Sequence, residues 1–291
     1  MTRTLLRYAV LLGAVGLAAC DLEVRNPNQP ETQRVLATPN DVESLLGSYY
    51  RRWHDGLYRN LGNVWGMAAV QSFEDYSSLA NNCMNQRVGI PRATNDNSIG
   101  NTCGGEQQRV YFVESEVARV ASSILNQLNT PPFTLGTPAR DARAKAFAEF
   151  LRGVAMGYLA LLYDSAAVVT PGMGSEDPGT LRGYKEVMDS ALAALQRSID
   201  FTTTAPAGSD GFPLPGTWIP SPTSFTAPEF IRLVRSYRAR LRANVARTPA
   251  ERAAVDWDAV IADAQNGITA DHLNTTNTVT GPFKNWVQQF D

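Results

Sequence analysis

Residues 142–199 read ARAKAFAEFLRGVAMGYLALLYDSAAVVTPGMGSEDPGTLRGYKEVMDSALAALQRSI, and this stretch decides the fold. In its first part, apolar residues recur at steps of three or four, the spacing of one helix face. They are Phe147, Leu151, Val154, Tyr158 and Leu162. After a break at Pro171 and Gly172 the rhythm resumes, with Thr180 as the expected cap. The second set is Tyr184, Met188, Ala191, Leu195 and Ile199. Neither helix hides its apolar stripe alone, so the stretch predicts a helical hairpin.

Two glycines lie on a neighbouring stripe of the first helix, at Gly153 and Gly157. Inside a helix, glycine costs roughly 1 kcal/mol relative to alanine, so tight packing has to compensate. We therefore expect a partner helix to approach closely at these positions.

A weak internal repeat supports this architecture. Five residues of the second helix correspond at equal offsets to five residues of a later one. The pairs are Tyr184 and Trp257, Val187 and Val260, Met188 and Ile261, Ala191 and Ala264, and Leu195 and Ile268. The preceding helices also match, around Phe150 and Phe230. The pattern favours divergent tetratricopeptide-like helix pairs; chance likeness between two amphipathic helices is the alternative. The predicted fold class is all-α, with tetratricopeptide-like helix-pair repeats and long irregular loops.

The first residues have the features of an export signal. Arg3 and Arg7 precede a short apolar run that is too short for a membrane-spanning helix. The tetrapeptide Leu17-Ala18-Ala19-Cys20 resembles the bacterial lipobox, in which the cysteine thiol accepts the lipid. We expect a lipoprotein signal peptide at 1–19, lipidation of Cys20 and a tether at 20–37; a plain signal peptide with an incidental cysteine is the alternative. Acyl chains hold a protein on a membrane by about 0.8 kcal/mol per buried CH₂ group.

Composition indicates a folded body behind this anchor. The chain is 44% hydrophobic and 19% charged, with a formal net charge of −2. Such a balance gives no electrostatic reason to expect nucleic acid as a partner. No later apolar run is long enough to span a bilayer, so the membrane is contacted through the lipid anchor only.

Further helices are expected at 38–53, 61–79, 106–128, 227–244 and 257–270, from apolar spacing and breakers. Between them, 81–105 is a long loop rich in asparagine and glycine, bracketed by Cys83 and Cys103. In an exported protein this pair predicts a disulfide, which stabilises on the order of 3 kcal/mol, against the alternative of two free thiols. The segment 202–228 is rich in Pro, Gly, Ser and Thr, and we expect an exposed aromatic group there, Phe212 with Trp218.

Catalytic and metal-binding patterns are scarce. His54 and His272 are far apart in sequence and have no metal-ligand companion at helical spacing. Glu74 and Asp75 are neighbours that would point in different directions on a helix. A calcium loop at 95–106 is disfavoured because Ile99 occupies a ligand position. We expect no catalytic residues, no metal and no cofactor.

Two other groups of side chains are candidates for binding. The arginines Arg232, Arg235, Arg238 and Arg242 form either a solvated helix face, which we favour, or an anion or partner patch. Aromatic residues cluster ahead of the asparagine-rich loop, and ring faces beside amides suit sugars. The candidate ligand-binding residues are Trp53, Tyr58, Phe73, Tyr76, Asn81, Asn82 and Trp218. For each ring taken singly, core packing is the alternative, and Trp65 and Tyr49 fall on apolar stripes.

Several features occur together along the mature chain. They are the lipobox cysteine followed by Asp21-Leu22-Glu23-Val24 and an Asn26-Pro27 turn, the ending Leu161-Leu162-Tyr163-Asp164 of helix 146–163, Tyr184-Lys185-Glu186-Val187, and Trp257-Asp258-Ala259-Val260. Together they resemble the SusD/RagB family of outer-membrane nutrient-binding lipoproteins. The resemblance implies a helical tetratricopeptide-like fold without enzymatic activity. Family members are commonly longer, so we expect 38–291 to form a single α-helical SusD-like domain that lacks a C-terminal part.

The functional expectation is a non-catalytic lipoprotein anchored at the cell outer membrane. The resemblance implies that it binds oligosaccharide or another nutrient and delivers it to a TonB-dependent, SusC-like β-barrel transporter. A tetratricopeptide-like envelope adaptor that binds protein partners without a small ligand is the alternative. An envelope hydrolase has the weakest support.

Overall fold

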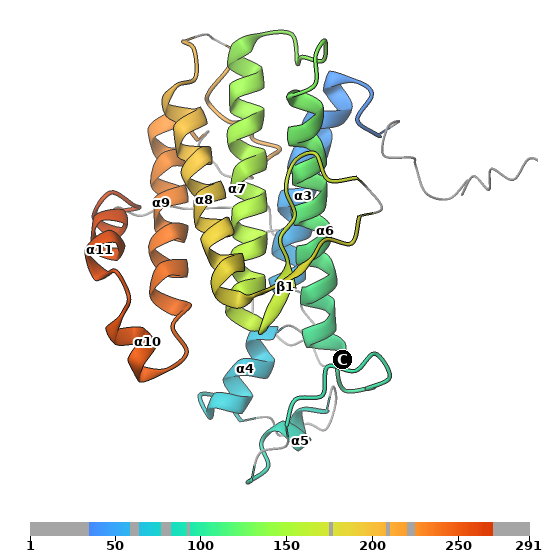
Figure 1. The fold of residues 1–291 in the computed structure, drawn as a ribbon, viewed down its shortest axis with the longest axis vertical. Helices are drawn as coiled ribbons and strands as arrows, with labels where there is room; N and C mark the ends of the chain where they lie inside the picture. Colours follow the sequence, from blue (N-terminus) through green and yellow to red (C-terminus); the bar gives the residue numbers. More distant parts are fainter. Residues whose placement is uncertain are drawn as a thin grey trace, which may run out of the picture. The chain divides into compact units, whose positions relative to one another are not determined.

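The computed structural model describes residues 35–58, 64–76, 83–91, 94–174, 177–207, 210–219 and 225–269 (Figure 1). The predictions for the signal peptide, for Cys20, for the tether through residue 34 and for Asn81 and Asn82 lie outside these residues. The described part from Leu36 onward is one compact unit.

The fold is mostly helical, as predicted. The helices are α3 (Pro39–Tyr58), α4 (Val64–Ser72), α5 (Met84–Arg87), α6 (Gly105–Leu128), α7 (Pro138–Leu162), α8 (Tyr184–Thr203), α9 (Ala227–Asn244), α10 (Pro249–Ala253) and α11 (Trp257–Gln265). A small antiparallel hairpin of β1 (Ser165–Ala167) and β2 (Leu181–Gly183) was not predicted; Ser165 lies opposite Gly183 in its register. That the helix pairs are of the tetratricopeptide kind stays a prediction.

Helix α7 is the centre of the core. Every residue from 146 to 160 is buried, which is the pattern of a helix covered on all sides. Helices α6 and α8 flank it, and α3 and α9 also pack on it (Figure 1). The predicted hairpin of α7 and α8 is therefore confirmed, although Gly183 rather than Thr180 precedes α8. Thr180 fails as a cap because the chain enters β2 before it turns into α8.

The two glycines of α7 bring neighbouring helices close, as predicted. A Cβ atom at Gly153 would lie 2.7 Å from the Cδ2 atom of Leu195 on α8. One at Gly157 would lie 2.5 Å from the Cδ1 atom of Leu241 on α9. Each missing side chain thus leaves a notch that a leucine of a different helix fills.

Helix boundaries deviate from the sequence prediction at three ends. Helix α3 continues beyond Trp53 to Tyr58, whereas α4 is shorter than 61–79 because Phe73 has a φ of 63°. A non-glycine residue rarely adopts this left-handed conformation, which ends the helix. Helix α11 ends at Gln265, before the expected residue 270.

The arginines of α9 do not form the solvated face that we favoured. Arg235, Arg238 and Arg242 all reach the carboxylate of Asp263 on α11, at 3.3, 2.9 and 3.3 Å. Asp263 is only 1% exposed, so this buried carboxylate is shared by three arginines and holds α11 against α9. Only Arg232 of the four is exposed. The prediction missed the pairing because the acidic partner lies on a later helix.

No helix among the described residues is both long and apolar enough to cross a lipid bilayer.

Candidate ligand-binding site

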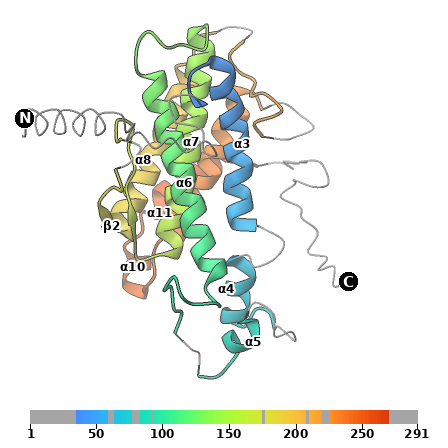
Figure 2. The ribbon, with the colours of Figure 1, turned by 90° about the vertical axis from the view of Figure 1, so that its right-hand side faces the viewer.

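The segment between α4 and α6 contains Phe73 and Tyr76, two of the five described residues that the sequence singled out for ligand binding. Figure 2 shows α4 and α5 at the end of the helical body where α6 begins. The predicted disulfide between Cys83 and Cys103 is confirmed, with their Cα atoms 5.5 Å apart. It closes the loop onto the start of α6. Contrary to the expectation of a structureless loop, the short helix α5 follows Cys83 directly.

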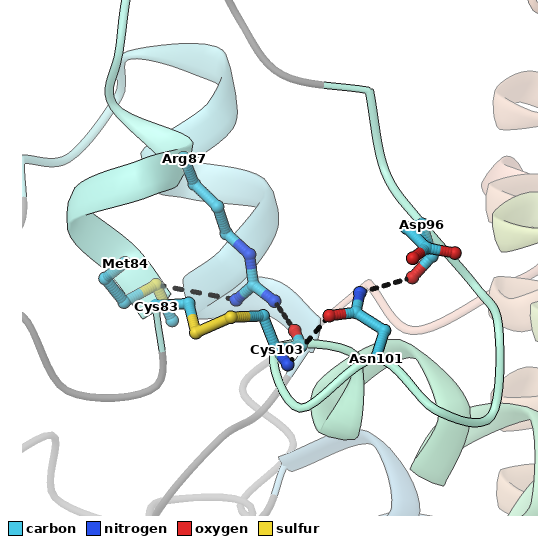
Figure 3. Close-up of a disulfide and its surroundings, with 6 residues drawn as sticks. All are labelled: Cys83, Met84, Arg87, Asp96, Asn101 and Cys103. Atoms are coloured by element: carbon cyan, nitrogen blue, oxygen red, sulfur yellow. Dashed lines mark hydrogen bonds between the residues drawn. A yellow bond between two sulfur atoms is a disulfide. The ribbon is translucent and has the colours of Figure 1, made fainter.

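Hydrogen bonds hold the loop around the disulfide, as Figure 3 shows. The Arg87 guanidinium donates to the carbonyl oxygen of Cys103 at 2.5 Å and faces the sulfur of Met84 at 3.8 Å. The Asn101 side chain donates to the carbonyl oxygen of Asp96 at 2.7 Å and accepts from the backbone N–H of Cys103 at 3.0 Å. The side-chain amide of Asn101 therefore helps to fix the loop, because both its NH₂ group and its oxygen form hydrogen bonds within the loop.

A further set of bonds joins this loop to its neighbours. The backbone N–H of Ser98 donates to the Asp96 carboxylate at 2.9 Å, which lowers the pKa of Asp96. The side chain of Gln108 on α6 donates to the carbonyl oxygen of Ser98 at 2.6 Å. The side chain of Gln71 on α4 donates to the Asn95 side-chain oxygen at 2.6 Å. The loop is thus attached to α6 on one side and to α4 on the other.

Phe73 and Tyr76 are the predicted aromatic residues that present their rings to solvent. Phe73 is 56% exposed and Tyr76 is 80% exposed, and both directly follow α4. The amide pair of Gln71 and Asn95 lies at the end of the same helix. We call these four residues the α4 platform. It combines aromatic faces with amide groups, as a sugar-binding surface requires.

Tyr58 is half-buried and contributes little free ring surface. Its ring stacks on His54, with centroids 4.9 Å apart, and lies 6.1 Å from the ring of Trp65. It packs against the core from the edge.

Trp53 and Trp218 are core residues, which corrects their assignment as ligand-binding side chains. Each is 1% exposed. Trp53 points from α3 toward α7, where Phe150 and Tyr158 surround it with ring centroids at 6.5 and 6.0 Å. Trp218 stacks near Phe147 at 4.9 Å, so the loop 202–228 folds its indole inward. Neither indole leaves a face on which a sugar can stack.

Phe212, expected to be exposed with Trp218, is instead half-buried, 5.9 Å from the ring of Phe230.

Sequence reasoning missed two strongly exposed apolar side chains in the same loop. Ile90 is 84% exposed and Ile99 is 87% exposed. Ile99 had been considered only as a residue that spoils a calcium loop. The signal in the sequence was an isolated isoleucine within a polar segment. Isoleucine is usually buried, so an isoleucine in such a segment is a candidate contact residue.

A third missed residue is Glu114 of α6, which is fully buried. It occupies the same helical stripe as Val110 and Val117, and a carboxylate on an apolar stripe was the signal for it. Burial raises the pKa of Glu114 well above its ordinary value, while the nearby Arg52 charge opposes the shift.

The remaining chemistry among the described residues is sparse. No three His, Cys, Asp or Glu side chains within the described ranges come together as a metal site. Glu74 and Asp75 are exposed next to the α4 platform. A shallow apolar hollow of about 450 Å³ lies at the other end of α6, lined in part by Pro39, Gln127 and Phe133. It is separate from the α4 platform because α6 runs 24 residues between them.

Comparisons of the chain with protein-family models, with curated proteins and with solved structures found no match. The resemblance to the SusD/RagB family therefore stays a prediction. The site has to be judged on its own geometry.

Proposed function

We propose that the protein is a non-catalytic binding lipoprotein that captures an oligosaccharide or a similar polyhydroxylated nutrient on the α4 platform. The observation that carries the proposal is the exposure of Phe73 and Tyr76 in the turn that follows α4, within five residues of Gln71, whose side chain is hydrogen-bonded to Asn95. Anchored through Cys20 at the outer membrane, it would deliver the ligand to a TonB-dependent β-barrel transporter. No step of this function requires bond making or breaking.

The chemistry of the α4 platform suits a sugar ring. The C–H faces of a pyranose stack on an aromatic face, and its hydroxyls exchange hydrogen bonds with amides, which both donate and accept. Tyr76, at 80% exposure, leaves most of its ring in water, and a stacked ligand would remove that apolar surface from solvent.

The closed loop supports binding in a second way. The disulfide between Cys83 and Cys103 and the Gln71–Asn95 hydrogen bond restrict the segment before a ligand arrives. A surface ordered in advance loses less conformational entropy on binding. A structural disulfide also favours an oxidising compartment, which agrees with the export signal on which the lipoprotein assignment depends.

One observation favours the adaptor alternative. Ile90 and Ile99 are the most exposed large apolar residues of the described chain, and they have no groups that hydrogen-bond a sugar. Exposed apolar side chains of this size are typical of protein contacts. An adaptor would use these isoleucines and leave Phe73 and Tyr76 without a small ligand.

A glycan array probed with the mature, disulfide-bonded protein tests the proposal, followed by titration of the best oligosaccharide. We expect Tyr76→Ala to weaken retention about tenfold, which corresponds to roughly 1.4 kcal/mol. The melting temperature should stay unchanged because the ring is largely in solvent. Phe112→Ala is the matched control, since Phe112 is an exposed aromatic residue on α6, outside the α4 platform.

An empty array, or equal retention by the Tyr76→Ala variant and the wild type, would contradict the proposal. Retention of a protein partner that Ile99→Ser abolishes would establish the adaptor instead.

A further inference from the structure

The outer side of α11 is apolar and exposed. Trp257 is 46% exposed, Ile261 is 50% exposed, and Ile268, which follows the helix, is 37% exposed. The spacing of four residues places Trp257 and Ile261 along one stripe of α11, on a different side of the helix from Asp263, and Ile268 lies just beyond the end of the helix. Asp263 holds α11 against α9, and Figure 1 shows the helix beside α9 at the edge of the helical body. We call these three residues the α11 stripe.

The internal repeat shows what such a stripe does elsewhere in the chain. Ile261 and Ile268 correspond in the repeat to Met188 and Leu195 of α8. Those two residues are 2% and 0% exposed, because α7 and α9 cover α8. Equivalent positions are therefore core in one helix and surface in the other. The difference is the lack of a covering element over α11 among the described residues.

The chain itself supplies a segment with a matching pattern. Residues 270–291 lie outside the described part, and their sequence includes GPFKNWVQQF at 281–290. Its apolar residues recur at steps of three, one and three, the spacing of one helix face. They are Phe283, Trp286, Val287 and Phe290. The residues 270–282 that precede them reach at most about 45 Å when extended, several times the roughly 14 Å length of α11.

The small size of the α11 stripe favours an occupant from the same chain. A nine-residue helix presents far less surface than the roughly 800 Å² per partner of a stable interface between separate molecules. A tethered segment meets its surface at an effective concentration in the millimolar range, so it needs less area. A second copy of the chain is for this reason the weaker choice.

We propose that the α11 stripe is the docking surface for residues 283–290 of the same chain, which cover it with Phe283, Trp286, Val287 and Phe290. Docking extends the stacking of helices by one layer beyond α11. The proposal is independent of any ligand on the α4 platform.

Hydrogen exchange of backbone amides, followed by mass spectrometry on the full mature chain, tests this docking. We expect peptides covering 283–290 to exchange at least about tenfold more slowly than in the denatured chain. Ile261→Ser should remove most of this protection. The control is Leu181→Ser, which changes an apolar residue of β2 that is 61% exposed, and it should leave 283–290 unaffected. Peptides from 146–160 report that each variant is folded.

Three results would overturn the proposal. A lack of protection at 283–290 in the wild type would show that this segment does not cover the stripe. Equal protection in wild type and Ile261→Ser would place the segment elsewhere. Protection that increases with protein concentration would show that the occupant is a second copy.

Discussion

The buried carboxyl group of Glu114 makes the stability of the fold dependent on pH. Glu114 lies on α6 and faces α3 so closely that a Cβ atom at Gly56 would lie 2.7 Å from its Oε1 atom. The side chain is 0% exposed, and neither carboxyl oxygen has a hydrogen-bond partner among the described residues. An ion in such a place is costly, which is why burial raises the pKa of Glu114.

The direction of the effect follows from the two states of the chain. In the unfolded chain the pKa of glutamate is about 4.3, and in the folded protein it is higher. Below pH 4 both states hold the proton and the group contributes nothing. As the pH rises, the unfolded chain loses the proton first, so the free energy of unfolding falls by up to about 1.4 kcal/mol per pH unit. The loss stops once the pH exceeds the folded pKa.

Glu114→Gln removes this contribution because an amide does not ionise. We expect the stability of the variant relative to wild type to increase with pH from about 5 upward, at up to about 1.4 kcal/mol per unit. Urea unfolding of both proteins at several pH values between 5 and 8 measures the difference. Glu116→Gln is the control for loss of a carboxylate on α6; Glu116 is partly exposed and paired with Arg52, so its loss should cost at most about 1 kcal/mol.

A difference that stays constant between pH 5 and 8 would refute the reasoning. It would mean that Glu114 has the same charge in the folded and unfolded chains. A wild type that gains stability over the variant as the pH rises would show that the folded protein stabilises the ionised form.

Three other changes test the packing. Asp263→Ala should destabilise the protein by about 3 kcal/mol, because it leaves the buried arginines without their carboxylate, and should make 254–265 more sensitive to chymotrypsin, which cleaves after Trp257. Gly153→Ala should lower the melting temperature, since overpacking costs about 1–3 kcal/mol and exceeds the gain in helix propensity. Gly174→Ala is the control and should leave the melting temperature unchanged, because a Cβ atom at this position meets open space. Cys83→Ser should cost about 3 kcal/mol in urea unfolding while residues 146–160 keep their exchange protection.

The helices of the core could be predicted because apolar spacing is a local property. Phe147, Leu151 and Val154 identify α7 as a core helix without reference to any other element, but they do not tell that residues 146–160 are buried on every side. The notches at Gly153 and Gly157 could be foreseen for a similar reason, because a glycine inside a long helix needs compensation from packing. The disulfide followed from cysteine positions and the expected compartment.

The hairpin of β1 and β2 could not be predicted, because three-residue strands are too short to show a period. The arginine cluster was misjudged because the partner of Arg238 lies 25 residues away on another helix. Both features depend on contacts between residues that are far apart in the sequence.

The site was predicted less well than the fold, because exposure of a ring depends on what covers it. Trp53 and Tyr76 are both aromatic residues near the same loop, yet one faces α7 and the other faces water. Sequence pattern places a residue on a helix face but does not tell which neighbouring helix reaches that face. The exposure of Ile90 and Ile99 was not predicted, because isoleucine is among the residue types most often buried.

The two notches of α7 restrict how its neighbours can move. Leu195 of α8 fits at Gly153, and Leu241 of α9 fits at Gly157. Sliding either neighbour by one helical turn, about 5.4 Å, would bring its leucine either onto a residue with a full side chain or into the notch that the other leucine already fills. Axial sliding of α8 and α9 along α7 is therefore blocked, and any rearrangement that accompanies ligand capture has to occur outside this three-helix register.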